Sequence, residues 1–333
     1  MWKMVSYEAC GRGHLKENIP CQDKTLQRRE RDIALIALAD GAGSCSKSDL
    51  GADIVTKYGA EIVKDNFDEF IKEENGMKVK KKIIDLLLKE LENKSVELKC
   101  SIKDLSSTFL LVCVRGEEFF IGHLGDGVIG VLKEEKLKVI SNPVNGEFIN
   151  NTVFVTSSLA YKYMQIYRGN ISDIDGFVLL SDGTCESLYD KRKKKLSIGI
   201  KKIMDYLGIL DEEKIKMNLI KSFENLILKK TLDDCSIGIM IKKSYGEKVY
   251  KNLEAEEKLK IFNLKGNNGK FKAKKLYEYE KLLQLLSEKP LSRKEIYKKI
   301  SLKNRYLRKE IRALENNGLV TSFNDEYYSN IKL

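Results

Sequence analysis

The spacing of apolar residues changes sharply along this 333-residue chain, and that change limits the folds open to it. Between residues 49 and 100 apolar residues recur every three or four positions, as in Ile54, Tyr58 and Ile62. This spacing is typical of amphipathic helices. It predicts two long helices in this region, separated near Asn75-Gly76.

Beyond residue 100 the apolar residues form short runs separated by glycine, asparagine and charged residues. Such runs predict strands. The predicted strands cover residues 109–114, 119–124, 128–132, 153–156, 177–180 and 237–241. A stretch with helical spacing, residues 212–228, lies before the last of them. The order of elements favours an α+β body in which helices cover sheets.

The last part of the chain has a different pattern. Residues 244–275, which include the lysine-flanked Gly266 to Gly269 segment, are expected to be a linker. In residues 276–333 we expect three helices, the second starting at the capping box of Ser292 and Glu295, followed by a hairpin around Asn324-Asp325. This is the outline of a winged helix-turn-helix-like domain, which leaves residues 1–243 as the main domain.

Positive charge is concentrated in this last part. The chain has a net charge of +11, and residues 246–333 hold 21 lysines and arginines against 12 acidic residues. Its third predicted helix places four basic residues on one face, namely Arg305, Arg308, Lys309 and Arg312. Such a face can contact DNA, but it is equally common on modules that dock proteins or dimerise. Both interpretations stay open at this stage.

Composition also limits the kind of metal site and the compartment. The chain has only two histidines, His14 and His123, so a histidine-rich metal site is excluded and oxygen ligands are favoured. Its seven cysteines are scattered and include no C-x-x-C pair, which indicates reduced thiols. No apolar run approaches the roughly 18 residues of a membrane span, and the first residues lack the layout of a secretory signal. A cytoplasmic protein without a membrane partner is expected.

Aspartates recur where the predicted strands end. Asp40, Asp126 and Asp182 each follow an apolar run and precede glycine, and the pair Asp233-Asp234 opens the last strand. A single Asp-Gly pair most often marks a turn. Several aspartates at the ends of buried strands would repel one another, and Mg²⁺ or Mn²⁺ relieves that repulsion with carboxylate and water ligands. Two such ions can activate a water and bind a phosphoryl group between them.

Six short segments of the chain, taken in order, resemble the motifs of the protein phosphatase 2C (PPM) family, and their forms are closest to its bacterial branch. They are Cys21-Gln22-Asp23, Ala39 to Ser44, Ser106-Ser107-Thr108, Gly122 to Gly127, Leu180 to Gly183 and Asp233 to Ser236. The resemblance covers about residues 1–243. It implies an α-β-β-α sandwich of two central antiparallel sheets flanked by helices. It also implies a metal-dependent phosphatase that removes phosphate from serine and threonine of proteins, opposing a Ser/Thr kinase.

The resemblance carries roles onto particular residues. Asp40 would bridge two Mg²⁺ or Mn²⁺ ions with help from the Gly41 carbonyl, and Asp182 and Asp233 would hold one of these ions. Asp23 would lie on or beside the second ion, and Asp126 matches the position that helps to bind a third, weaker ion. A hydroxide shared by the metals would then attack phosphorus in line.

The chain departs from the family at the substrate phosphate. Many relatives have an arginine where this chain has Asn18, so Arg12, His14 or Lys16 would have to contact the phosphate. Ala42 replaces the histidine that acts as general acid in some animal members, and metal-bound water could supply that proton. A competing hypothesis makes the chain a DNA-binding regulator whose phosphatase-like body acts as a sensor.

Overall fold

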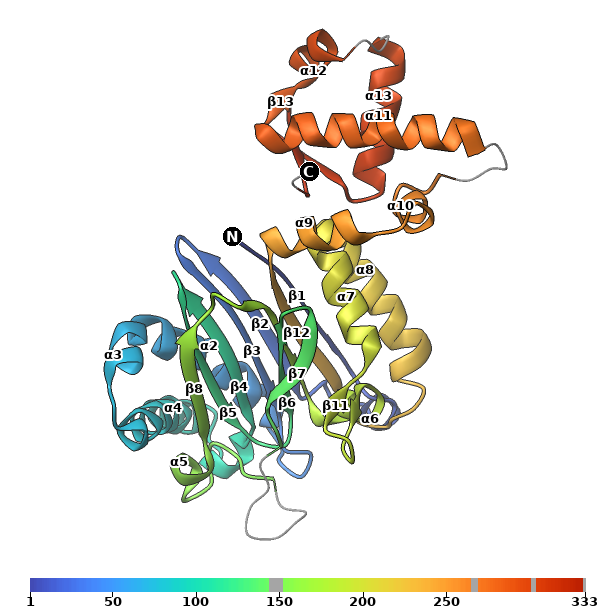
Figure 1. Cartoon of the computed structure of the whole chain (residues 1–333). Helices are drawn as coiled ribbons and strands as arrows, with labels where there is room; N and C mark the ends of the chain where they lie inside the picture. The colour runs from blue at the N-terminus through green and yellow to red at the C-terminus, as the bar shows by residue number, and fades with distance from the viewer. Residues whose placement is uncertain (144–151, 265–268, 301–303, 332–333) are drawn as a thin grey trace. The chain divides into compact units, whose positions relative to one another are not determined.

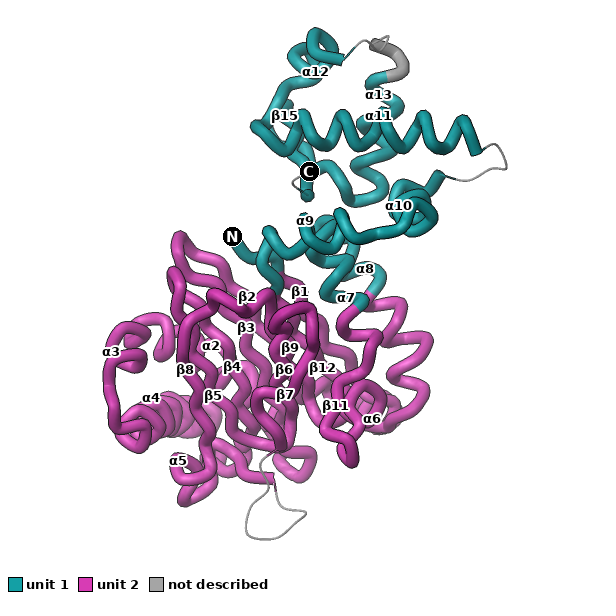
Figure 2. Tube along the Cα trace, viewed as in Figure 1, with its two compact units in different colours: residues 1–3, 202–218, 241–333 teal, residues 4–201, 219–240 magenta. Residues whose placement is uncertain are grey.

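The structure is a computed structural model. It describes residues 1–143, 152–264, 269–300 and 304–331, with the backbone alone for residues 304–306. The chain divides into two compact units (Figure 2). One comprises Met4–Lys201 and Leu219–Met240, and the other comprises Met1–Lys3, Lys202–Asn218 and Ile241–Leu333.

Two five-stranded sheets make up the centre of the first unit (Figure 1). In one sheet β6 pairs antiparallel with both of its neighbours, and in the other all four pairings are antiparallel. The first sheet has the order β1 (Trp2–Ala9), β12 (Cys235–Lys242), β9 (Ile174–Leu180), β6 (Val128–Lys133) and β7 (Lys136–Ser141). The second has the order β2 (Asp23–Glu30), β3 (Ile33–Asp40), β4 (Phe109–Arg115), β5 (Glu118–Leu124) and β8 (Gln165–Asn170).

The two faces of β3 explain why this strand is apolar throughout. Leu35 and Ala37 belong to a buried cluster shared with the helices, whereas Ile36 lies against Gly238 of β12 in the other sheet. Because successive residues of a strand point to opposite faces, a strand between helices and a second sheet must be apolar on both. The two sheets therefore face each other, and β3 lies in the middle of the layers.

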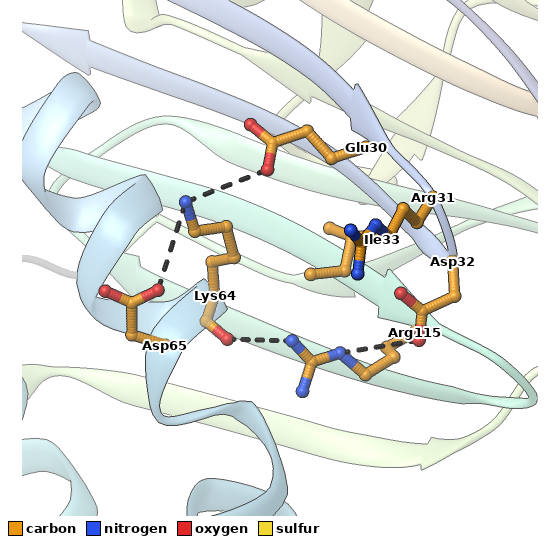
Figure 3. A pocket seen from close by; sticks show the side chains of 7 residues that line it. All are labelled: Glu30, Arg31, Asp32, Ile33, Lys64, Asp65 and Arg115. Atoms are coloured by element: carbon orange, nitrogen blue, oxygen red, sulfur yellow. Dashed lines mark hydrogen bonds and ion pairs between the residues drawn. The ribbon is translucent and has the colours of Figure 1, made fainter.

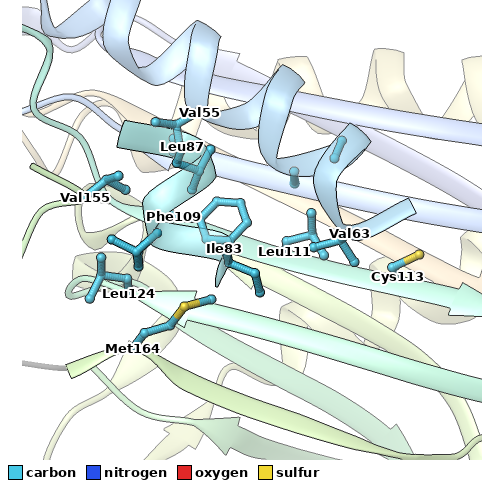
Figure 4. Packing of buried hydrophobic residues seen from close by; sticks show 14 of the residues in the cluster. Val55, Val63, Ile83, Leu87, Phe109, Leu111, Cys113, Leu124, Val155 and Met164 are labelled. Atoms are coloured by element: carbon cyan, nitrogen blue, oxygen red, sulfur yellow. The ribbon is translucent and has the colours of Figure 1, made fainter. Parts of the chain in front are cut away.

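Helices α2 (Ser48–Asp65) and α4 (Gly76–Glu97) cover the outer face of the second sheet, and α3 (Phe67–Lys72) lies between them in sequence. Figure 4 shows the packing, in which Val55 and Val63 of α2 and Ile83 and Leu87 of α4 surround Phe109 of β4. All five side chains are buried. This confirms the expected helical region and its interruption near Asn75-Gly76, and the side chain of Asn75 caps α4.

Shorter elements follow the strands of the two sheets, and most of α7 and α8 among them belongs to the second unit. At the other sheet, Tyr7 of β1 contacts Phe223 edge to face, with ring centroids 5.2 Å apart. The remaining elements up to residue 227 are α1 (Arg12–Glu17), η1 (Ile102–Leu105), α5 (Ala160–Tyr163), α6 (Asp182–Leu188), β10 (Tyr189–Asp190), β11 (Lys195–Leu196), α7 (Ile198–Ile209), α8 (Glu212–Ser222) and the π-helical turn η2 (Phe223–Ile227). The expected α+β fold, with antiparallel sheets flanked by helices, is confirmed.

The second unit is mostly helical and contains a small sheet of order β13-β15-β14. The expected capping box is present, since the side chains of Ser292 and Glu295 each accept a hydrogen bond from the other residue's backbone amide. Gly266 to Asn268 lie outside the described residues. The elements are α9 (Lys243–Asn252), α10 (Ala255–Ile261), α11 (Gly269–Glu288), β13 (Leu291–Ser292), α12 (Arg293–Lys299), α13 (Asn304–Asn316), β14 (Val320–Phe323) and β15 (Glu326–Ser329).

Lys3 connects distant segments within this second unit. Its buried ammonium group donates hydrogen bonds to the carbonyls of Gly208 and Leu210, at 3.0 and 2.9 Å, and to the carbonyl of Asn330 at 2.7 Å. Three carbonyl acceptors match the three donors of an ammonium group. The lysine thereby joins the end of α7 to the segment that follows β15.

One predicted strand of the first unit is wrong, and two observed strands were not predicted. No strand covers residues 153–156, although Val153 and Val155 are buried, because the backbone there turns rather than pairing along a neighbouring strand. Strands β7 and β8 were not predicted, because their residues are only partly buried and form no continuous apolar run. Among the described residues, no helix combines the length and apolar character needed to cross a membrane.

Candidate metal centre

Aspartates from five segments of the first unit come together at one end of the two sheets. Asp23 begins β2 and lies directly opposite Asp40, the last residue of β3, in the antiparallel pairing. Asp126 lies between β5 and β6, Asp182 begins α6 after β9, and Asp233 precedes β12. Neighbouring strands of each sheet thus bring to one edge residues that are far apart in sequence.

Three of these aspartates form a tight group. Asp40, Asp126 and Asp182 each present a carboxylate oxygen, and these atoms lie within 4.8 Å of one another. Asp233 is outside that group but lines the same pocket, which has a volume of about 170 Å³. The described lining includes no lysine or arginine. Its members are His14, Gln22, Asp40, Gly41, Ala42, Gly43, Asp126, Thr152, Phe154, Asp182, Asp233 and Asp234.

Backbone and hydroxyl groups fix the orientation of these carboxylates. Thr108 makes two hydrogen bonds to the backbone of Asp40. The Thr108 hydroxyl accepts from the Asp40 amide at 2.9 Å, and the Thr108 amide donates to the Asp40 carbonyl at 2.8 Å. The Gly183 amide donates to Asp182 Oδ1 at 2.6 Å, and the Thr152 hydroxyl donates to Asp126 Oδ2. The group is therefore positioned by its surroundings.

Close packing at Gly183 explains the glycine after Asp182. A Cβ atom added there would lie 2.1 Å from the Asp234 carbonyl oxygen, far inside contact distance. Only glycine lets the first turn of α6 approach the segment before β12 this closely. Asp182 and Asp233 consequently line one pocket.

Asp23 is the most deeply buried of the five. Its side chain has no solvent exposure, and neither carboxylate oxygen forms a hydrogen bond with any described residue. The hydroxyls of Ser236 and Ser181 lie near enough to favour the charged form. Burial outweighs them and raises the pKa of Asp23 to about 8, with a further increase from the charge of Asp182.

The neighbouring carboxylates are perturbed in the same direction. Burial raises the pKa of Asp40 well above its ordinary value, and the charges of Asp23 and Asp182 raise it further. Burial likewise raises the pKa of Asp182 to about 6, and it also raises the pKa of Asp233. Carboxylates this close together resist ionisation, because each negative charge repels the others. A divalent cation bound among them would make the ionised form favourable, because its positive charge offsets that repulsion.

Asp234 has a different environment. It is buried, and its two oxygens accept hydrogen bonds of 2.6 Å from the backbone amides of Gly11 and Gln22. His14 Nδ1 lies 2.9 Å from Asp234 Oδ2. Asp234 therefore joins the segment before β12 to both ends of the loop that contains α1.

The candidate phosphate contacts differ in position. His14 lines the carboxylate pocket, whereas Arg12 is exposed, does not line it and donates from Nε to the Thr231 carbonyl at 3.2 Å. Lys16 is exposed on the same short helix. The other histidine, His123, is fully buried, with Nδ1 2.6 Å from the Ser141 hydroxyl, and burial lowers its pKa to about 3.

Sequence reasoning missed Thr152 and Phe154, which line the pocket. No motif marks these two residues; Phe154 lies in the segment where a strand was predicted, and Thr152 lies just before that segment. Thr108 belongs to one of the six motifs, but the sequence assigned it no role. The pairing of β3 with β4 brings it next to Asp40, where its hydroxyl accepts a hydrogen bond from the Asp40 amide.

A second pocket, of about 880 Å³, lies at the opposite end of the β2–β3 hairpin (Figure 3). Lys64 lies 3.8 Å from Glu30 and 3.9 Å from Asp65, and Arg115 lies 3.8 Å from Asp32. Each acidic residue there thus has a cationic neighbour. The larger pocket is balanced in charge, in contrast to the smaller one with its unopposed carboxylates.

Comparison with known proteins agrees with this geometry. The sequence model of the family described as protein phosphatase 2C matches residues 10–223, which is more than half of the chain. The chain belongs to the protein phosphatase 2C family. The expectation that it is an enzyme, a protein phosphatase, is confirmed at this level, and metal dependence is general in the family.

Individual relatives are more distant. The chain is 23% identical over 174 residues to serine/threonine-protein phosphatase 3 of Escherichia coli (strain K12), a match that covers 50% of this chain and 67% of the relative. Among solved structures, serine/threonine phosphatase Stp1 from Staphylococcus aureus matches with a TM-score of 0.51 and 14% identity, over 73% of this chain and 95% of that one. A bacterial serine phosphatase matches with a TM-score of 0.51 and 15% identity, over 72% and 98% of the two chains. At these identities the structural matches show the shared fold alone.

Proposed function

We propose that this protein phosphatase hydrolyses phosphoserine and phosphothreonine in proteins at a binuclear Mg²⁺ or Mn²⁺ centre. The observation that carries the proposal is the pocket itself, where several carboxylates meet without a lysine or arginine in the described lining. By this proposal Asp40, the Gly41 carbonyl, Asp182 and Asp233 would hold the ions. Asp23 supports the second ion, and Asp126 contributes to a third, weaker site.

The residues present fit hard divalent cations. All the candidate ligands offer oxygen, as Mg²⁺ and Mn²⁺ prefer, and three carboxylate oxygens already lie within 4.8 Å of one another. The buried oxygens of Asp23 have no hydrogen-bond partner among the described residues. When bound, the ions would neutralise charge on the phosphoryl group and make water a better nucleophile.

The chain's own residues would position the substrate and keep the carboxylates in place. Thr108 accepts a hydrogen bond from the backbone amide of Asp40, and the amide of Gly183 donates one to the Asp182 carboxylate. Of the three phosphate contacts predicted from the sequence, His14 is the best placed, because its ring lines the pocket and neither Arg12 nor Lys16 does. The substrate would be a phosphoprotein made by a Ser/Thr kinase, in the cytoplasm.

The test is Mn²⁺-dependent hydrolysis of a phosphothreonine peptide by the full chain. Asp40→Asn and Asp182→Asn should each lower kcat/KM by about 10²-fold or more, since each removes charge from the metal site. Asp32→Asn is the matched control, because Asp32 lies at the other end of the same hairpin and is 63% exposed. Equal activity in wild type and in Asp40→Asn would refute the proposal.

A second role is proposed for residues 276–333, as a winged helix-turn-helix-like domain that contacts DNA. The supporting observation is α13, where Leu307, Ile311 and Leu314 are buried while Arg308, Lys309 and Arg312 are exposed. The side chain of Arg305 lies outside the described residues. Such a domain would make the chain a DNA-binding regulator as well as an enzyme, with residues 244–275 as its link to the phosphatase domain of residues 1–243.

A further inference from the structure

His14 occupies a position that its sequence context does not explain. It is one of only two histidines in the chain, and the other is fully buried in β5. The ring of His14 lines the carboxylate pocket and also an adjoining open hollow of about 590 Å³. That hollow is lined by residues such as Glu17, Lys230 and the exposed Leu232. His14 thus borders both the carboxylates and a surface large enough to receive a peptide.

A buried carboxylate lies directly beside this ring. His14 Nδ1 lies 2.9 Å from Asp234 Oδ2, and Asp234 is itself fixed by the amides of Gly11 and Gln22. Because those segments lie before and after α1, the carboxylate cannot turn away from the ring. The other ring nitrogen, Nε2, forms no hydrogen bond or ion pair with any described residue. It is the nitrogen left for a ligand.

An imidazole with one nitrogen at ion-pair distance from a buried aspartate, and its second nitrogen open, is an arrangement suited to proton transfer. We propose that His14, positioned by Asp234, is the general acid that protonates the leaving oxygen of phosphoserine or phosphothreonine. This rests on the proposed function, since it assigns a further step to the same pocket. It replaces the expectation that metal-bound water supplies the proton.

The oxygen of a water molecule attacks phosphorus and forms the new P–O bond, while the P–O bond to the serine or threonine oxygen breaks. The leaving oxygen takes the proton from His14 Nε2 and departs as a neutral hydroxyl. The attacking water loses a proton to solvent, and His14 regains one from solvent. An alkoxide leaves poorly without this proton, whereas p-nitrophenolate is a stable anion and gains less from it.

The test compares two substrates with His14→Gln, which keeps an N–H donor but cannot transfer its proton. We expect kcat/KM for a phosphoserine peptide to fall by about 10²-fold or more. The decrease in kcat/KM for p-nitrophenyl phosphate should be at least about 10-fold smaller than the decrease for the phosphoserine peptide. Asp32→Asn, an exposed change at the far end of the β2–β3 hairpin, is the control and should affect both substrates equally. Thermal unfolding and Mg²⁺ binding of both variants check their folding.

A second readout does not depend on turnover. In protein labelled with ¹³C-histidine, inorganic phosphate added with Mg²⁺ should shift the ring signal of His14 and leave that of buried His123 unchanged. Equal losses with both substrates in His14→Gln, or an unmoved His14 signal at saturating phosphate, would overturn the proposal while leaving the phosphatase assignment intact. A wild-type chain that hydrolyses neither substrate would instead remove the proposed function, and this inference with it.

Discussion

At the scale of single residues, the aspartates could be predicted because strand ends fix where a carboxylate can lie. Asp40, Asp126 and Asp182 each follow an apolar run, and the structure gathers them within 4.8 Å. The partners of Asp234 could not be predicted. Its carboxylate contacts the amides of Gly11 and Gln22 across more than 200 residues, and no local pattern encodes such a contact.

The burial of Asp23 predicts an unusual pH dependence of stability in the metal-free protein. Its pKa is raised to about 8 in the folded chain from an ordinary value of 3.8 in the unfolded one, so folding favours the protonated form. The stabilising contribution is present below about pH 4 and is lost as the pH rises toward 8. The slope reaches at most about 1.4 kcal/mol per pH unit for each proton released.

Urea unfolding in EDTA at pH 6, 7 and 8 measures this effect. The free energy of unfolding should fall with pH, and Asp23→Asn should reduce that fall because an amide does not titrate. Asp182, with its pKa raised to about 6, contributes with the same sign at the lower end of the range. A metal-free wild type whose stability rises from pH 6 to pH 8 would contradict the environment described for Asp23.

At the scale of helices and strands, the strands predicted accurately are those in which nearly every residue is buried. Strands β4, β5 and β6 are apolar almost throughout because they lie inside the sandwich, and all three were predicted within one residue at each end. β7 and β8 alternate or are half exposed, so their sequences resemble loops. Residues 153–156 were predicted as a strand but form a turn. Val153 and Val155 are buried in it, so the sequence has the apolar character expected of a buried strand.

The exposed basic face of α13 predicts salt-dependent DNA binding by the full chain. Replacing Arg308, Lys309 and Arg312 with glutamine removes charges that would neutralise phosphates, so affinity should fall and its dependence on salt concentration should weaken. Binding titrations at several salt concentrations measure both. Phosphatase activity serves as the control and should not change. Absence of DNA binding in the wild type would reject the DNA role and favour protein docking for this domain.

At the scale of the whole molecule, the decisive information lay in the order of weak motifs. Each Asp-Gly pair alone indicates only a turn, but together they identified the protein phosphatase 2C family, which the match over residues 10–223 confirms. The division into units could not be read from the sequence. Lys3 belongs to the same compact unit as residues 241–333 because its ammonium group bonds to carbonyls more than 200 positions away.

Catalysis as proposed depends on two divalent ions bound in the carboxylate pocket. Calorimetric titration of the metal-free chain with Mn²⁺ tests it most directly, with Asp40→Asn and the control Asp32→Asn measured alongside. We predict two ions per chain in the wild type and in Asp32→Asn, and loss or at least about 10-fold weakening of binding in Asp40→Asn. Identical titrations of wild type and Asp40→Asn, or a wild type that binds no Mn²⁺, would contradict the metal centre described here.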